Sequence, residues 1–91
     1  MDRALLISYL RAAEEHVSND VQDIADQREL ISTLERTGHN ATSAIARLRE
    51  MEKTQTRHLA DRERLRSELA ELSAAELGNR RRIRRTPYGR R

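Results

Sequence analysis

Few side chains in this sequence could form a chemical site, and those that could stand at helical spacings. His16 precedes Asp20 by four residues, and His58 precedes Arg62 by four, so each pair shares one face of a helix. Facing carboxylates and imidazoles hold metal ions in some bundles, but neither His16 nor His58 follows a glutamate by three positions, as paired Glu-x-x-His motifs require. We therefore predict no metal and assign a polar layer, which either sets register and oligomeric state or faces solvent. Its members are Asp20, Gln27, Gln55, His58 and Arg62.

Catalytic motifs are missing from the sequence. It contains no cysteine, which excludes a thiol nucleophile, a thiolate zinc site and a disulfide framework. Its three glycines are isolated, so none forms a phosphate-binding loop, and its serines lack a suitably spaced base and orienting residue. We predict a protein that is not an enzyme and needs no cofactor.

Two long helices must position the polar layer. Ala, Glu, Lys, Leu and Arg make up 50 of the 91 residues, a bias typical of long helices and coiled coils. Gly and Pro are absent from 2–37 and from 39–77. The sequence predicts a helix over about 2–37 with Asp2 as N-cap, a turn at 38–40, and a helix over about 41–77. In the turn, Gly38 serves as the C′ residue and Asn40 as the N-cap, with Thr42 as the alternative. The turn residues are Gly38, His39 and Asn40.

Apolar residues recur at spacings of three and four in both helices, which indicates one buried face on each. Because the turn is short, residues equally far from it should face each other, such as Leu10 with Leu69 and Asp20 with His58 and Arg62. The predicted seam consists of Leu6, Leu10, Val17, Ile24, Ile31, Leu34, Ile45, Leu48, Met51, Leu59, Leu65, Leu69 and Leu72.

The fold class is therefore all-α, an antiparallel helical hairpin. An isolated hairpin leaves much of the surface of each helix exposed to solvent, and helices take most of their stability from packing. We expect assembly into a four-helix bundle or coiled coil, with a homodimer as the simplest form. Capture of an unknown protein partner by the same face is the other way to cover it.

The C-terminal segment differs in charge from the rest of the chain. Residues 79–91 carry a formal charge of +7, whereas residues 1–78 carry −4. We predict a flexible tail that starts where the second helix ends, because Pro87 cannot continue a helix. Such a tail could bind nucleic acid or an anionic membrane surface. Arginine outnumbers lysine 17 to 1 throughout, which also fits a coding bias. The candidate polyanion-binding residues are Arg80, Arg81, Arg82, Arg84 and Arg85.

Targeting signals are not evident. No apolar run approaches the roughly 20 residues that span a bilayer. The N-terminal apolar stretch is short and lacks a basic leader. We expect a cytoplasmic protein with no membrane span.

Two groups of residues on either side of the turn carry a resemblance to known proteins. They are Gln27, Arg28, Ile31, Leu34, Gly38, His39 and Asn40, then His58, Arg62, Glu63, Arg64 and Leu65. In these residues, the stretch 23–69 resembles a group of small, uncharacterised two-helix proteins of rhizobial and related alphaproteobacteria. The resemblance implies a hairpin and an organism class, but no activity. The group often has a further histidine in the first helix, where Gln22 and Asp23 stand here.

From these observations we predict a self-associating helical scaffold or adaptor. The alternative is an accessory nucleic-acid-binding protein that uses its arginine-rich tail.

Overall fold

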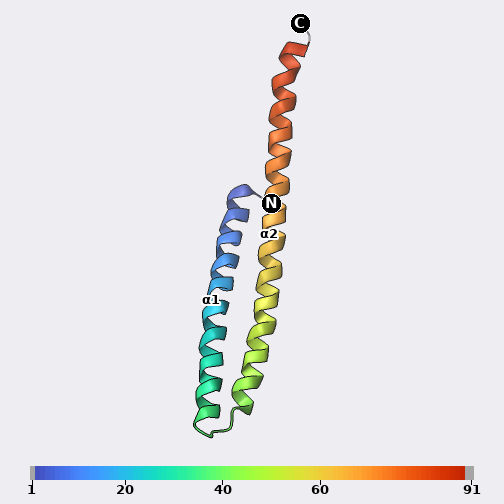
Figure 1. Ribbon diagram of the computed structural model, residues 1–91. Helices are drawn as coiled ribbons and strands as arrows, with labels where there is room; N and C mark the ends of the chain where they lie inside the picture. The colour runs from blue at the N-terminus through green and yellow to red at the C-terminus, as the bar shows by residue number, and fades with distance from the viewer. Residues whose placement is uncertain (1, 90–91) are drawn as a thin grey trace.

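The protein is an antiparallel pair of helices. The computed structural model describes the backbone of residues 2–89 and the side chains of residues 2–78. Helix α1 (Arg3–Arg36) and helix α2 (Thr42–Gly89) run side by side and join through a short turn (Figure 1). The described residues contain no β-strand, which confirms the predicted all-α hairpin. Within the same residues, neither helix has an apolar stretch long enough to cross a lipid bilayer.

Gly38 ends α1 in the way its position predicts. Its φ of 77° lies in the left-handed region, which glycine enters without a steric penalty. The N–H of His39 donates to the carbonyl of Leu34 at 2.8 Å, and the N–H of Gly38 donates to that of Glu35 at 3.2 Å. This pair of bonds is a Schellman motif, and it satisfies two carbonyls that the helix end leaves free.

The start of α2 differs by one residue from the prediction. The carbonyl of Ala41 accepts the first helical bond, from the N–H of Ile45 at 2.9 Å, so Ala41 holds the N-cap position in place of Asn40 or Thr42. Asn40 still caps from one residue earlier, because its Oδ1 accepts from the N–H of Thr42 at 2.9 Å. Ala41 is buried, at 8% exposed, so this cap position already belongs to the packed face. At the other helix, Asp2 is the N-cap residue, but its side chain makes no capping bond.

Helix α2 is longer than predicted. It continues through Gly78 to Gly89, so the prediction that it ends at about residue 77 is wrong. Gly78 does not adopt a positive φ. A glycine inside a helix costs about 1 kcal/mol relative to alanine, which good helix formers on both sides can offset. Pro87 lies in the last turn of α2, where the loss of one backbone bond interrupts little helix. As Figure 1 shows, this part of α2 projects past the start of α1.

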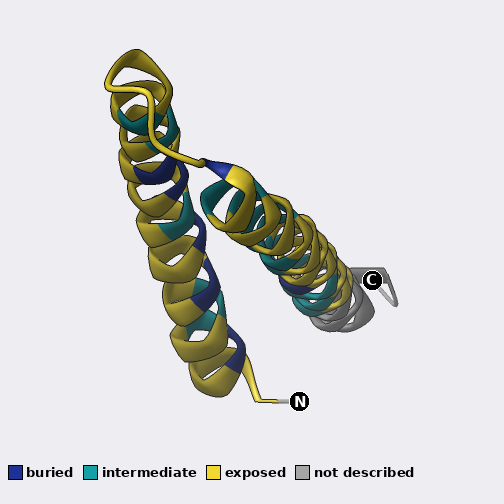
Figure 2. Ribbon diagram, turned by 90° about the horizontal axis from the view of Figure 1, so that it is seen from below, coloured by how far each residue is buried: buried dark blue, intermediate teal, exposed yellow. Residues whose placement is uncertain are grey.

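The core is a narrow seam between the helices (Figure 2). The buried apolar residues in the described part of the chain are Leu6, Ala13, Val17 and Ile24 from α1, with Ala41 at the N-cap of α2 and Leu65 within α2. Leu6, Ala13 and Leu65 form one cluster, against which Leu10, Leu69 and Leu72 pack. This cluster confirms the predicted pairing of residues equally far from the turn. The half-buried members of the seam are Leu10, Ile31, Leu34, Ile45, Leu48, Met51, Leu69 and Leu72.

One predicted seam residue lies outside the core. Leu59 is 36% exposed, because it lies to one side of the line that Leu65 and Leu69 follow along α2. The sequence-based assignment missed Ala41, since a small residue beside a turn carries little apolar signal.

Candidate functional site

Asp20 and His58 meet across the two helices near the middle of the hairpin. Nδ1 of His58 lies 2.5 Å from Oδ2 of Asp20. Asp20 is the more buried of the two, with a side chain 13% exposed against 27% for His58. A carboxylate only accepts hydrogen bonds, so Nδ1 carries the hydrogen in this contact. The predicted approach of these two residues is confirmed.

His16 extends this contact toward solvent. Its ring centroid lies 4.9 Å from that of His58, with the two rings tilted by 31°. His16 is exposed, whereas His58 is half-buried. The sequence spacing that placed His16 and Asp20 on one face of α1 therefore brings both to His58, Asp20 through a hydrogen bond and His16 through ring contact.

Arg62 does not complete the layer as predicted. The described residues show no ion pair or hydrogen bond between Arg62 and Asp20, and the Nε of Arg62 is buried without a hydrogen-bond partner. His58 already occupies the carboxylate of Asp20, and Arg62 lies one turn further along α2. Of the two residues predicted to pair with Asp20, only His58 hydrogen-bonds to it.

Gln27 is the most buried member of the polar layer, at 7% exposed. Its Nε2 donates to the carbonyl of Ala44 at 2.8 Å, which ties α1 to the first turn of α2. A buried amide costs stability unless it is hydrogen-bonded, so this contact explains how the seam accepts a polar residue. Gln55 is half-buried on the facing helix.

The layer joins the two helices through two hydrogen bonds, one from His58 to Asp20 and one from Gln27 to Ala44. Across the described residues, no three His, Cys, Asp or Glu side chains converge as metal ligands would. A histidine oriented by a carboxylate is one part of a nucleophilic triad. No serine or threonine hydroxyl in the described part of the chain hydrogen-bonds to His58. A slide of α2 by one turn, about 5.4 Å, would break the hydrogen bond between His58 and Asp20, so the pair opposes such a slide.

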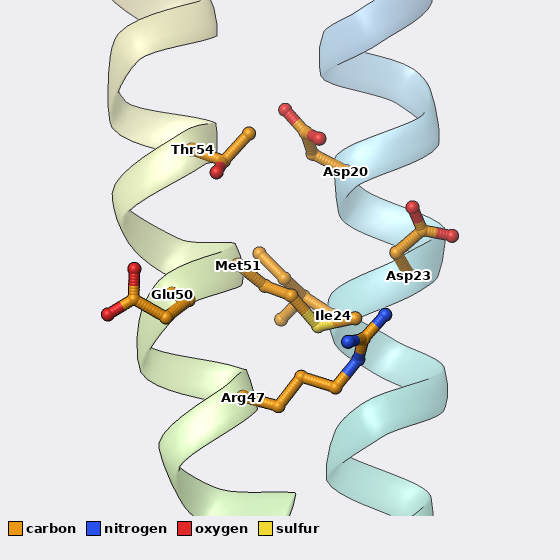
Figure 3. A pocket seen from close by; sticks show the side chains of 7 residues that line it. All are labelled: Asp20, Asp23, Ile24, Arg47, Glu50, Met51 and Thr54. Carbon is orange, nitrogen blue, oxygen red and sulfur yellow. The ribbon is translucent and has the colours of Figure 1, made fainter.

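On one side of the seam the surface between the helices is hollowed. A hollow of about 270 Å³ is lined by Asp20, Asp23, Ile24, Arg47, Glu50, Met51 and Thr54. In Figure 3, Asp20 and Thr54 point toward each other, and Arg47 reaches from α2 toward α1. A second hollow of about 250 Å³ is lined by Tyr9, Ala12, Ala13, His16, Asp61, Arg64 and Leu65. We call this side the open edge; it follows Tyr9, His16, Asp23 and Leu30 on α1, and Arg47, Thr54 and Asp61 on α2, each at seven-residue spacing.

On the other side of the seam, ion pairs join the helices. Arg66 Nη2 lies 3.2 Å from Glu14 Oε2, and Arg28 Nη2 lies 3.1 Å from Glu52 Oε2. Exposed side chains of Val21 and Leu59 lie between the two pairs. We call this side the bridged edge; it consists of Glu14, Val21 and Arg28 on α1, and Glu52, Leu59 and Arg66 on α2. The sequence-based assignment missed it, although the seven-residue spacing of these residues on each helix is a signal that could have found it.

The other predicted site residues lie elsewhere. The Thr37 hydroxyl oxygen lies 2.8 Å from His39 Nδ1 in the exposed turn. The five candidate polyanion-binding arginines belong to the part of α2 whose side chains lie outside the description.

Comparison of the chain with protein-family models, with curated proteins and with solved structures finds no match.

Proposed function

We propose that the protein is a self-associating helical scaffold or adaptor. The observation that carries this proposal is the small core. Among residues 2–78, six apolar residues are buried, and no large side chain is less than 2% exposed. An isolated hairpin of this kind offsets little of the entropy lost when its helices form.

The surface area supports the same proposal. The chain exposes 7286 Å², whereas a compact monomer of its mass exposes about 5,500 Å². The excess of about 1,800 Å² combines the part of α2 that projects past α1 with the sides of the paired helices that do not face each other. A standard interface between two proteins buries about 1,600 Å² in total, and the uncovered sides of the paired helices are where a second hairpin would bury such an area.

Light scattering coupled to size-exclusion chromatography tests the proposal. We expect a mass of twice the 10.6 kDa of one chain, falling on dilution together with the helical signal in circular dichroism. A monomer that stays fully helical across the dilution series would contradict self-association.

A second candidate function is nucleic-acid binding by the end of α2. It is favoured by the continuation of α2 to Gly89, since the segment past α1 contains the five candidate arginines. A cationic segment neutralises phosphates without sequence preference, and its affinity falls steeply with salt. Residues 1–78 without the segment should lose salt-sensitive retention of RNA and DNA while keeping their assembly. Equal retention by both lengths would exclude this function.

A further inference from the structure

We infer that a second copy of the chain docks on the bridged edge, antiparallel to the first, with its contact centred on Val21 and Leu59. This inference rests on the proposed self-association and assigns it a surface. The bridged edge has three properties that an interface between identical copies needs: an apolar centre, side chains already held in place, and charges that complement themselves.

The apolar centre lies on both helices at one level. Val21 follows Glu14 by seven residues and precedes Arg28 by seven, and Leu59 stands in the same relation to Glu52 and Arg66. Since the ion pairs join Glu14 to Arg66 and Arg28 to Glu52, Val21 and Leu59 lie beside each other between them. Val21 is 57% exposed and Leu59 is 36% exposed. Contact with another apolar surface would remove this area from water.

The two ion pairs order the charged side chains that surround Val21 and Leu59. Glu14, Arg66, Arg28 and Glu52 already engage one another within the hairpin, so a partner meets side chains that have lost part of their rotamer freedom. Ordering such side chains is one of the costs of association. A polar rim around an apolar centre is also the usual anatomy of an interface.

The charges of the bridged edge complement themselves. Two identical copies in a closed dimer present the same surface to each other, so that surface must match its own rotated image. Consider a twofold axis that crosses the helices at the level of Val21 and Leu59. It places Glu14 of one copy opposite Arg28 of the other. The same axis places Arg66 opposite Glu52, so all four rim charges meet unlike charges.

The charge of the C-terminal segment selects the antiparallel arrangement. A twofold axis along the hairpin would also match unlike charges, with Glu14 of one copy opposite Arg66 of the other. It would, however, place the last part of α2 in both copies, with a formal charge of +5 over residues 79–89, at the same end. Packed helices lie about 8–10 Å apart, and the Debye length at physiological salt is about 8 Å, so their repulsion would be only partly screened. The antiparallel dimer puts the two segments at opposite ends.

The open edge does not offer a comparable centre. Its exposed large apolar side chains, Tyr9 and Leu30, both belong to α1 and stand 21 residues apart, about 32 Å along a helix. Among the described residues of α2, no exposed large apolar side chain lies on that edge. Its surface is also hollowed between the helices, so a flat partner would leave gaps.

Val21→Glu with Leu30→Glu as its matched control tests the assigned face. Both positions are exposed on α1, and glutamate favours helices, so each variant should keep its fold, as circular dichroism at low concentration will show. We expect Val21→Glu to dissociate at least tenfold more readily than the unchanged chain in sedimentation equilibrium, and Leu30→Glu to dissociate as the unchanged chain does. Two variants that dimerise equally well would overturn the assigned face while leaving self-association intact. A monomeric unchanged chain would overturn both proposals.

Single cysteines test the orientation, because the chain has none of its own. In the antiparallel dimer Val21 faces Val21 of the second copy, so oxidation of Val21→Cys should give a disulfide-linked dimer, whereas Leu30→Cys should stay monomeric on a non-reducing gel. If Val21→Cys links to Leu59→Cys in a mixture but not to itself, the copies are parallel and the orientation is wrong. If Leu30→Cys links and Val21→Cys does not, the face is wrong.

Discussion

The two edges of the hairpin flank the same seam, yet the helices close one and leave the other open. Along the bridged edge, ion pairs at 3.2 and 3.1 Å span the helices on either side of Val21 and Leu59. Along the open edge, hollows of about 270 and 250 Å³ lie between side chains that mostly do not reach across. The two edges also differ in where their exposed large apolar side chains lie. On the bridged edge Val21 and Leu59 lie at one level on the two helices, whereas on the open edge Tyr9 and Leu30 both belong to α1.

The largest expected effect comes from the seam that both edges share. Leu65 is 5% exposed in the main cluster, so Leu65→Ala should lower the free energy of unfolding by about 2–5 kcal/mol. Leu30→Ala makes the same type of change on the open edge, where the side chain is 46% exposed, and should cost less than about 1 kcal/mol. Thermal and urea unfolding measure both. Equal losses would show that the seam does not dominate and that the edges carry the stability.

Next comes the polar pair at the seam beside the open edge. Asp20→Ala removes the acceptor of His58 and leaves a half-buried imidazole without its partner. We expect a loss of about 1–3 kcal/mol in urea unfolding. Asp20→Asn keeps an acceptor oxygen at the same place and should recover part of the loss. If both variants unfold like the unchanged chain, the pair contributes nothing to the register of the helices.

A substitution in the turn between the helices should lower the free energy of unfolding by a similar or smaller amount. Gly38→Ala puts a side chain at a φ of 77°, where the cost is about 1–2 kcal/mol even though no atom crowds the added methyl group. Gly78→Ala is the control with the opposite sign. Gly78 lies inside α2 without a positive φ and with open space around it, so alanine should stabilise by about 0.5–1 kcal/mol. Chemical unfolding of both variants checks the signs, and a stabilising Gly38→Ala would contradict the described turn.

The smallest stability effects belong to the bridged edge itself. Arg66→Gln and Arg28→Gln each break one exposed ion pair, with side chains between 45% and 63% exposed, so each should cost about 0.2–1 kcal/mol and less at high salt. Lys53→Gln breaks a pair within α2 alone and is the matched control. Unfolding at low and high salt measures the difference. If Lys53→Gln lowers the free energy of unfolding as much as the other two substitutions, the ion pairs between the helices stabilise the hairpin no more than a pair within one helix does.

Much of the fold could be predicted because it depends on local signals. Uninterrupted helix formers, apolar spacings of three and four, and one glycine at a chain reversal are readable residue by residue, and they placed Gly38, Leu6, Leu65 and the Asp20–His58 contact correctly. The errors arose where local signals compete with their surroundings. Gly78 resembles a helix end in sequence, yet helix formers on both sides carry α2 through it. The resemblance to small two-helix proteins of alphaproteobacteria stays a prediction.

By itself, the sequence determined that the chain forms two helices, where the chain reverses direction between them, and which stripe of each helix is apolar. These features follow from helix propensity and from the periodicity of apolar residues along the chain. Only the tertiary structure decided whether a residue near that stripe lies in the core or at one of its two edges. Leu59 is exposed on the bridged edge beside Val21, Asp20 hydrogen-bonds to His58 and not to Arg62, and Ala41 is buried where the seam reaches the turn. The physical reason is that the crossing and rotation of two packed helices set these contacts. A shift of a fraction of a turn, which no sequence period reports, moves a side chain from the core to an edge.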